Sequence, residues 1–174
     1  MAMHKSDELR EVVAVLFTQL QHIGFDIKFC SIALIDKVNS TVEFWLSGFS
    51  QDILPESYHV PNLDHPFYQN FQNTFRQGTP YKVFELAGDE KRSYDKLWFT
   101  LTDFKSLPDA VKKPMMEMDS VVLSCAFTKN GMIQIGGFQP LSDTNAFVVQ
   151  RFAKVFEQSY TRFLDLQKAE AQAK

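Results

Sequence analysis

The stretch Val121-Val-Leu-Ser-Cys-Ala-Phe-Thr128, which continues through Lys129, Asn130 and Gly131 into Met132-Ile-Gln-Ile-Gly-Gly-Phe138, decides the fold of this chain. Both runs are rich in residues that favour β-strands. Asn-Gly is a common two-residue hairpin turn, because both residues tolerate the positive φ angles that such a turn requires. The stretch therefore predicts an antiparallel hairpin that turns at Asn130-Gly131.

A turn at these two positions also predicts which residues pair across the hairpin. The predicted pairs are Phe127 with Gln134, Cys125 with Gly136, and Leu123 with Phe138. The opposite face carries smaller side chains that suit close packing against helices, namely Ser124, Ala126, Ile133, Ile135 and Gly137. We therefore expect the first face to lie under a lid and the second to lie under helices.

A long helix is predicted after the hairpin. Pro140 ends the second strand, and Ser142 or Asp143 can cap a helix over 142–174. Its apolar positions are Val148, Phe152, Val155, Phe156, Phe163 and Leu166. The last residues favour helix and contain no Gly or Pro stop, so we expect this signalling helix to continue into a linker.

A second amphipathic helix is predicted over 1–24. Ser6 or Asp7 can cap it, and Gly24 is placed to end it. One apolar stripe runs along it, formed by Leu9, Val12, Val13, Leu16, Phe17, Leu20 and Ile23. The spacing of these residues is that of a helix with one buried face.

Two strands are predicted next, over 27–35 and 41–47. The first is apolar at nearly every position, which is typical of a sheet covered on both faces. The second alternates: Val42, Phe44 and Leu46 point to one face, and Glu43 and Trp45 to the other.

The middle third is less regular. Asp64 can cap a short helix that carries Phe67, Phe71 and Phe75 and ends at Gly78. Residues 81–86 alternate like a strand, 88–103 fit a second helix, and 108–118 form a further helical piece that contains Pro114. The chain is thus predicted to be a single α+β domain over 1–174. A central antiparallel sheet carries the two terminal helices on one face and a helical and loop lid on the other.

Composition excludes several classes of function. The net charge is -3 without a long basic run, so nucleic acid and anionic membranes are poor partners. No window is long and apolar enough for a membrane span, and the first residues lack the apolar core of a signal peptide. Cys30 and Cys125 both fall within strands, where buried thiols are expected rather than a disulfide, and this favours a cytoplasmic location.

The order of elements resembles that of GAF domains, the small-molecule sensor modules of signalling proteins. The segments Met1-Ala-Met-His-Lys-Ser-Asp-Glu-Leu9 and 151–173 are similar to linkers of bacterial sensor histidine kinases and nucleotide cyclases. The resemblance implies a non-catalytic sensory region, without the phospho-acceptor helix or ATP lid of a kinase. The cysteine, cyclic-nucleotide and bilin signatures of known GAF subfamilies are not found, so the cofactor, if any, is unknown.

Candidate ligand-binding residues follow from the predicted lid face. They are Gln134, Cys125, Phe127, Trp45, Phe84, Tyr94 and Trp98. Gln134 is polar on an otherwise apolar face and can orient a polar ligand group, although it can equally bond the lid backbone. The aromatic residues can line a cavity or simply fill the core. His59 and His65 have no neighbouring carboxylate or cysteine cluster in the sequence that would support a metal site.

Three functions remain open at this point. The first is a sensory domain that binds a small molecule or relays signal through its end helices, as a homodimer formed by the terminal helices. The second is a ligand-free GAF domain that serves as a dimerisation and spacer module. The third is a small enzyme that uses Cys125, and the absence of catalytic motifs makes a non-enzymatic role the expectation.

Overall fold

The computed structural model describes residues 2–48 and 57–173. The elements in chain order are α1 (Ala2–His22), β1 (Phe29–Asp36), β2 (Thr41–Ser47), β3 (Tyr58–Val60), α2 (Pro66–Arg76), β4 (Tyr81–Ala87), α3 (Gly88–Leu101), the 3-10 helix η1 (Asp103–Ser106), α4 (Asp109–Glu117), β5 (Ser120–Phe127), β6 (Gly131–Gly137) and α5 (Asp143–Gln172). Strand β3 and helix η1 were not predicted from the sequence. No helix in this part of the chain combines the length and apolar character needed to cross a membrane.

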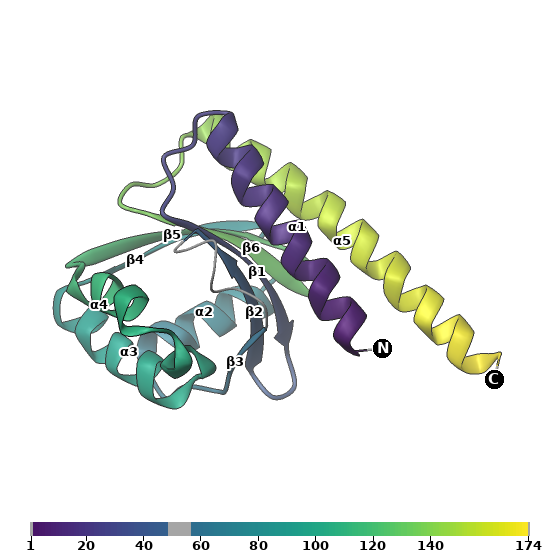
Figure 1. Ribbon diagram of the computed structural model, residues 1–174, viewed down its shortest axis with the longest axis horizontal. Helices are drawn as coiled ribbons and strands as arrows, with labels where there is room; N and C mark the ends of the chain where they lie inside the picture. The colour runs from purple at the N-terminus through teal and green to yellow at the C-terminus, as the bar shows by residue number, and fades with distance from the viewer. Residues whose placement is uncertain (1, 49–56, 174) are drawn as a thin grey trace.

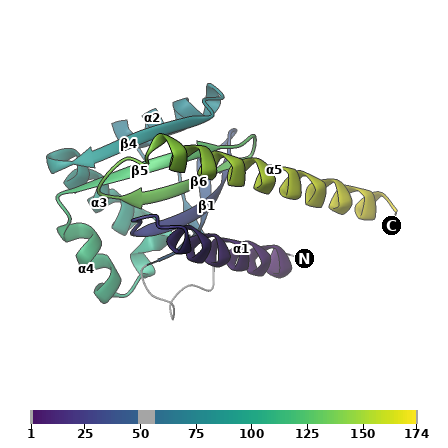
Figure 2. The same cartoon turned by 90° about the horizontal axis from the view of Figure 1, so that it is seen from above.

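The described strands form one sheet in the order β3-β2-β1-β6-β5-β4, and all neighbouring strands are antiparallel. Helices α1 and α5 lie side by side on one face, and α2, α3 and α4 cover the other (Figures 1 and 2). This confirms the α+β, GAF-like arrangement that the sequence predicted, in which both terminal helices lie on the same face.

Each face of the sheet has its own hydrophobic core. The front core, under α2 to α4, contains Ala33, Phe44, Leu123 and Met132 among many aromatic residues. The back core, under α1 and α5, is built from a different set, which includes Leu16, Leu20, Cys30, Ile32, Trp45, Ile133, Ile135 and Val149. Strand β1 contributes to both cores by alternation, which explains why it is apolar at nearly every position.

The register of the β5–β6 hairpin differs from the predicted one by two residues. Cys125 pairs with Gln134, and Phe127 pairs with Met132. Lys129 and Asn130 occupy the turn, where the Thr128 N–H donates to the Gly131 carbonyl oxygen at 2.7 Å. A shift of two residues leaves every side chain on its predicted face, because successive side chains of a strand alternate.

The predicted turn at Asn130-Gly131 is therefore wrong, and the reason is the neighbouring strand. Neither residue has a positive φ. A β-carbon at Gly131 would lie 1.8 Å from the carbonyl oxygen of Ala33, because β1 passes directly beside it. The Ile35 N–H also donates to the Asn130 carbonyl at 2.9 Å. Pairing with β1 thus outweighs the turn preference of Asn-Gly, and the glycine is needed for close approach.

Several predicted helix caps also need correction. Helix α1 begins at Ala2, so Ser6 and Asp7 lie inside it. His65, rather than Asp64, caps α2, since its Nδ1 accepts a hydrogen bond from the Phe67 N–H at 3.1 Å.

The remaining predicted boundaries agree more closely with the structure. Ser142 caps α5, and its Oγ accepts from the Asn145 N–H at 3.2 Å. Gly24 and Gly78 follow their helices with φ values of 92° and 73°. Strand β1 begins at Phe29, two residues later than the sequence indicated.

Candidate functional site

A cavity of about 100 Å³ lies between the front face of the sheet and the layer formed by α2, α3, α4 and η1. Its walls are mainly aromatic, and the rings come from Phe29, Phe44, Phe67, Tyr68, Phe71, Tyr94, Trp98, Phe99 and Phe104. Trp98 stacks on Phe104 with ring centroids 4.7 Å apart and meets Phe44 edge-on at 5.6 Å. These contacts hold the rings in fixed orientations, so the cavity has flat, rigid walls.

A short polar row crosses the sheet at the cavity, and its members Ser31 and Gln134 form part of the cavity floor. Gln134 on β6 pairs with Ser31 on β1 and with Cys125 on β5. The Ser31 Oγ donates to the Gln134 Oε1 at 3.4 Å, and the Gln134 Nε2 donates to the Cys125 Sγ at 3.6 Å. Both contacts are long, so they use little of the bonding capacity of the Gln134 amide, although this side chain is only 9 % exposed.

Helix α3 places a buried ion pair against the cavity. Lys91 is 3 % exposed, and its ammonium donates to the Asp95 carboxylate at 2.5 Å and to the Met115 carbonyl at 2.8 Å. Both charged residues line the cavity. Burial raises the pKa of Asp95, and the hydrogen bond and charge of Lys91 oppose that rise. The charges of the two residues cancel.

Glycine at position 136 shapes the same floor. A β-carbon there would lie 2.1 Å from the ring of Phe29. Gly136 therefore allows that ring to lie across β6, where it forms part of the cavity wall. The neighbouring Gly137 has no such role, since a β-carbon at that position would meet its nearest atom at 3.6 Å.

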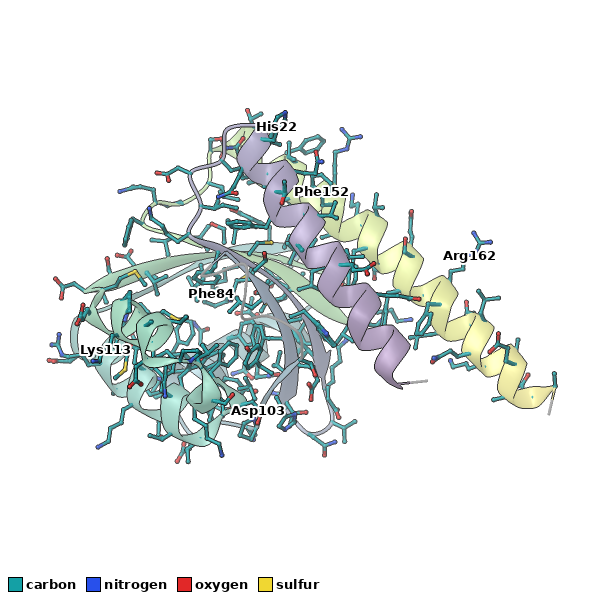
Figure 3. The ribbon with its side chains drawn as sticks, viewed as in Figure 1. His22, Phe84, Asp103, Lys113, Phe152 and Arg162 are labelled. Atoms are coloured by element: carbon teal, nitrogen blue, oxygen red, sulfur yellow. The ribbon has the colours of Figure 1, made fainter. Side chains whose placement is uncertain are left out.

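Three of the seven predicted site residues line the cavity, namely Gln134, Tyr94 and Trp98. Cys125, Phe84 and Phe127 lie in or against the front core outside the cavity lining. Figure 3 shows Phe84 between the sheet and the α3–α4 layer. Trp45 is placed wrongly by the prediction, because it belongs to the back core. The alternation of β2 directs Phe44 and Leu46 to the front and Trp45 to the back.

The cavity is also lined by residues outside the seven candidates, among them Ser31, Phe44, Lys91 and Asp95. The sequence did contain a signal for Lys91. It precedes Tyr94 and Trp98 by three and seven positions, so all three residues lie on one face of α3. A lysine on an aromatic helix face indicates a partner nearby, and Asp95 is the carboxylate one turn away.

The two cysteines are buried, and His59 and His65 each contact a polar side chain. Burial raises the pKa of Cys30 far above its usual range and that of Cys125 to about 12. Both therefore remain neutral thiols at pH 7, whereas a nucleophilic cysteine requires a thiolate. His59 Nδ1 contacts the Glu43 carboxylate at 2.6 Å, and His65 Nε2 contacts the Ser93 hydroxyl at 2.8 Å. Within residues 2–48 and 57–173, no three His, Cys, Asp or Glu residues are grouped to hold a metal ion.

A second hollow, of about 580 Å³, lies on the back face between α1 and α5. Its apolar lining includes Val12, Val15, Phe152, Val155 and Phe156, and its floor is Ile32 and Ile133. Several of these side chains remain open to solvent: Val15 is 59 % exposed and Val155 is 60 % exposed. Phe152 is seen on α5 in Figure 3. We refer to this hollow as the α1–α5 groove.

Comparison with known proteins supports the fold. No protein-family model matches the chain, and no curated protein matches it significantly. Among solved structures, the chain is similar to a fragment of a methyl-accepting chemotaxis protein, residues 122 to 287 of that protein. The two share 18 % sequence identity with a TM-score of 0.51, over 95 % of this chain and 96 % of the other. At this level of identity the similarity shows a shared fold.

Proposed function

We propose that this chain is a non-catalytic sensory domain of a signal-transduction protein, which binds a small molecule in the front cavity and reports its presence through α1 and α5. The GAF-like resemblance and the terminal segments similar to kinase and cyclase linkers support this role. The structural neighbour, a methyl-accepting chemotaxis protein, belongs to a signalling class. A histidine kinase of the two-component type is the effector that the resemblance favours.

One observation carries the proposal: the cavity and the α1–α5 groove lie on opposite faces of the same two strands. Ser31 and Gln134 line the cavity, while the next residues along each strand, Ile32 and Ile133, line the groove. Both pairs are direct partners in the β1–β6 ladder. A ligand that displaces this part of the ladder also displaces the surface on which the terminal helices pack. The difference between its affinities for the two helix arrangements drives the change.

A thermal-shift screen of metabolites tests whether the cavity is a ligand site. At least one compound is expected to raise the unfolding temperature, because binding to the native state alone stabilises it. Leu123 lines the cavity, so the Leu123→Trp variant should lose that response. Glu85→Trp, at an exposed position of β4, should retain it. If every stabilising compound acts equally on wild type and Leu123→Trp, the compounds bind elsewhere and the cavity site is refuted.

The α1–α5 groove is proposed to hold the same surface of a second copy. Its rim is acidic on α1, at Glu8 and Glu11, and α5 carries exposed Lys154 and Arg162. A two-fold axis brings α1 of one protomer against α5 of its partner, which matches these charges and covers the exposed valines. The terminal helices would then form the dimer through which signal passes.

Sedimentation velocity tests the dimer. Wild type is expected to self-associate, and Val155→Glu is expected to raise the dimer dissociation constant at least about tenfold, because it buries a charge in an apolar contact. Val38→Glu is the matched control, since Val38 is 90 % exposed and lies outside the groove. A wild-type monomer at high concentration, or equal association of wild type and Val155→Glu, would contradict this dimer.

The alternative is a ligand-free dimerisation and spacer module. The small size of the front cavity favours it, since about 100 Å³ is modest for a metabolite site. In that case the groove still pairs two copies, but no compound stabilises the protein through the cavity. The two experiments together therefore separate a sensor from a spacer.

A further inference from the structure

The front cavity also indicates what kind of molecule it takes, and this inference rests on the proposed sensory function. Its charged lining residues are Lys91 and Asp95, which pair with each other. A charged ligand would lose its hydration there without finding an unpaired opposite charge, which is costly in a largely apolar site. The cavity therefore favours an uncharged molecule.

Size and shape restrict the ligand further. An apolar protein cavity of about 150 Å³ is known to hold one benzene molecule. At about 100 Å³, this cavity suits a single small ring or a compact group of similar bulk. Phe44, Trp98 and Phe104 present flat faces and edges at fixed angles, so a planar ring gains the most contact.

Gln134 is the residue that can recognise a polar group of the ligand. Its side-chain amide offers two N–H donors and an acceptor oxygen, and its two contacts, to Ser31 and Cys125, are 3.4 and 3.6 Å long. A ligand with a donor and an acceptor on adjacent atoms can pair with both ends of this amide. A ring lactam has that edge: its N–H donates to Oε1 while its carbonyl accepts from Nε2.

We propose that the front cavity binds a compact, uncharged, planar molecule that carries a lactam or equivalent donor–acceptor edge, with Gln134 as the residue that recognises that edge. The aromatic walls supply most of the contact area, and Gln134 supplies the selectivity. A site built to hydrogen-bond a polar edge rejects an analogue that lacks it more strongly than an apolar pocket rejects a change in size.

NMR titration with three small probes tests this proposal. The probes are 2-pyrrolidone, which has the lactam edge; cyclopentanone, which has the same shape but only the acceptor; and pyroglutamate, which adds a carboxylate. For wild type, 2-pyrrolidone is expected to bind about fivefold to tenfold more tightly than cyclopentanone, the effect of one additional hydrogen bond. Pyroglutamate is expected to bind more weakly than 2-pyrrolidone.

Two variants locate the selectivity. Gln134→Met keeps the bulk of the side chain and should abolish the preference for 2-pyrrolidone, because it removes two hydrogen bonds from the lactam edge but only one from the cyclopentanone carbonyl. Gln150→Met is the matched control, because Gln150 lies on α5 and donates to the Ala146 carbonyl on the other side of the sheet. It should keep the preference. The comparison of probes on wild type stands by itself if Gln134→Met does not fold.

The outcomes distinguish a failure of the lactam proposal from a failure of the proposed sensory function. If cyclopentanone and 2-pyrrolidone bind the cavity equally, or pyroglutamate binds most tightly, the lactam proposal is overturned while the cavity remains a ligand site. If no probe perturbs the signals of cavity residues, the lactam proposal fails as well. A stabilising compound from the metabolite screen that Leu123→Trp abolishes would then still uphold the sensory function.

Discussion

Replacing Gly131 with alanine is expected to lower the free energy of unfolding by about 3 kcal/mol, at the upper end of the usual cost of overpacking. The added β-carbon would lie 1.8 Å from the Ala33 carbonyl oxygen and 2.9 Å from its carbonyl carbon. Both are backbone atoms of a central strand, which cannot rotate away as a side chain can. The β1–β6 ladder must separate to admit the methyl group.

Urea denaturation followed by tryptophan fluorescence measures this loss, and the chain provides a matched control. Gly137 is also in β6, but a β-carbon there would meet its nearest atom, the Asp26 carbonyl oxygen, at 3.6 Å. Gly137→Ala is therefore expected to change the free energy of unfolding by less than about 1 kcal/mol. Equal stability of the two variants would show that β1 does not pass beside Gly131 as described.

The second large effect is expected at the buried ion pair of α3. Asp95→Asn leaves the almost fully buried Lys91 ammonium without an opposite charge, and breaking a buried ion pair in this way costs about 3–5 kcal/mol. The double variant Lys91→Met/Asp95→Leu removes both charges and should be more stable than Asp95→Asn. Asp89→Asn is the control, because Asp89 forms an exposed pair with Arg92 and should leave the unfolding midpoint near that of wild type.

The stability of Lys91→Met should depend on pH differently from that of wild type. Burial already raises the pKa of Asp95 in the folded protein, and removing Lys91 takes away the group that lowers it. The folded variant then binds a proton more readily than the unfolded chain, so its stability falls as pH rises above the unfolded pKa of aspartate. Denaturation at several pH values should find Lys91→Met closest to wild type in acid. A deficit that is constant with pH would rule out this role for Asp95.

The sequence was sufficient for the elements that depend on local periodicity. Residues 41–47 are a strand with the predicted boundaries, and the terminal helices lie on the same face of the sheet, as predicted. The α5 residues buried there include Val149 and Ala153, which lie outside the predicted stripe, whereas Val155 of that stripe is exposed. The hairpin register could not be predicted, because it depends on how close β1 comes to Gly131, which is a long-range contact. The face assignment survived this error, since the register moved by two residues.

The candidate site was only partly predictable for similar reasons. Gln134 stood out because it is polar on an apolar face. Trp45 is a candidate as one of several aromatic residues, although the alternation of its own strand places Phe44 at the cavity. From the sequence, a solvated helix face explains Lys91 as well as a binding role does. Only the packing of α4 against α3, through the Met115 carbonyl, shows that Lys91 and Asp95 form a buried pair.

Coupling between the front cavity and the terminal helices is best tested by a distance across the α1–α5 groove. Spin labels can be placed at Thr18→Cys on α1 and Gln158→Cys on α5, both exposed positions, because the native Cys30 and Cys125 are buried. The label-to-label distance is then measured with the cavity empty, with it filled by Leu123→Trp, and with a stabilising metabolite from the screen. Transmission through β1 and β6 predicts that both ways of filling the cavity shift the distance distribution in the same direction. An identical distribution in all three samples would contradict it.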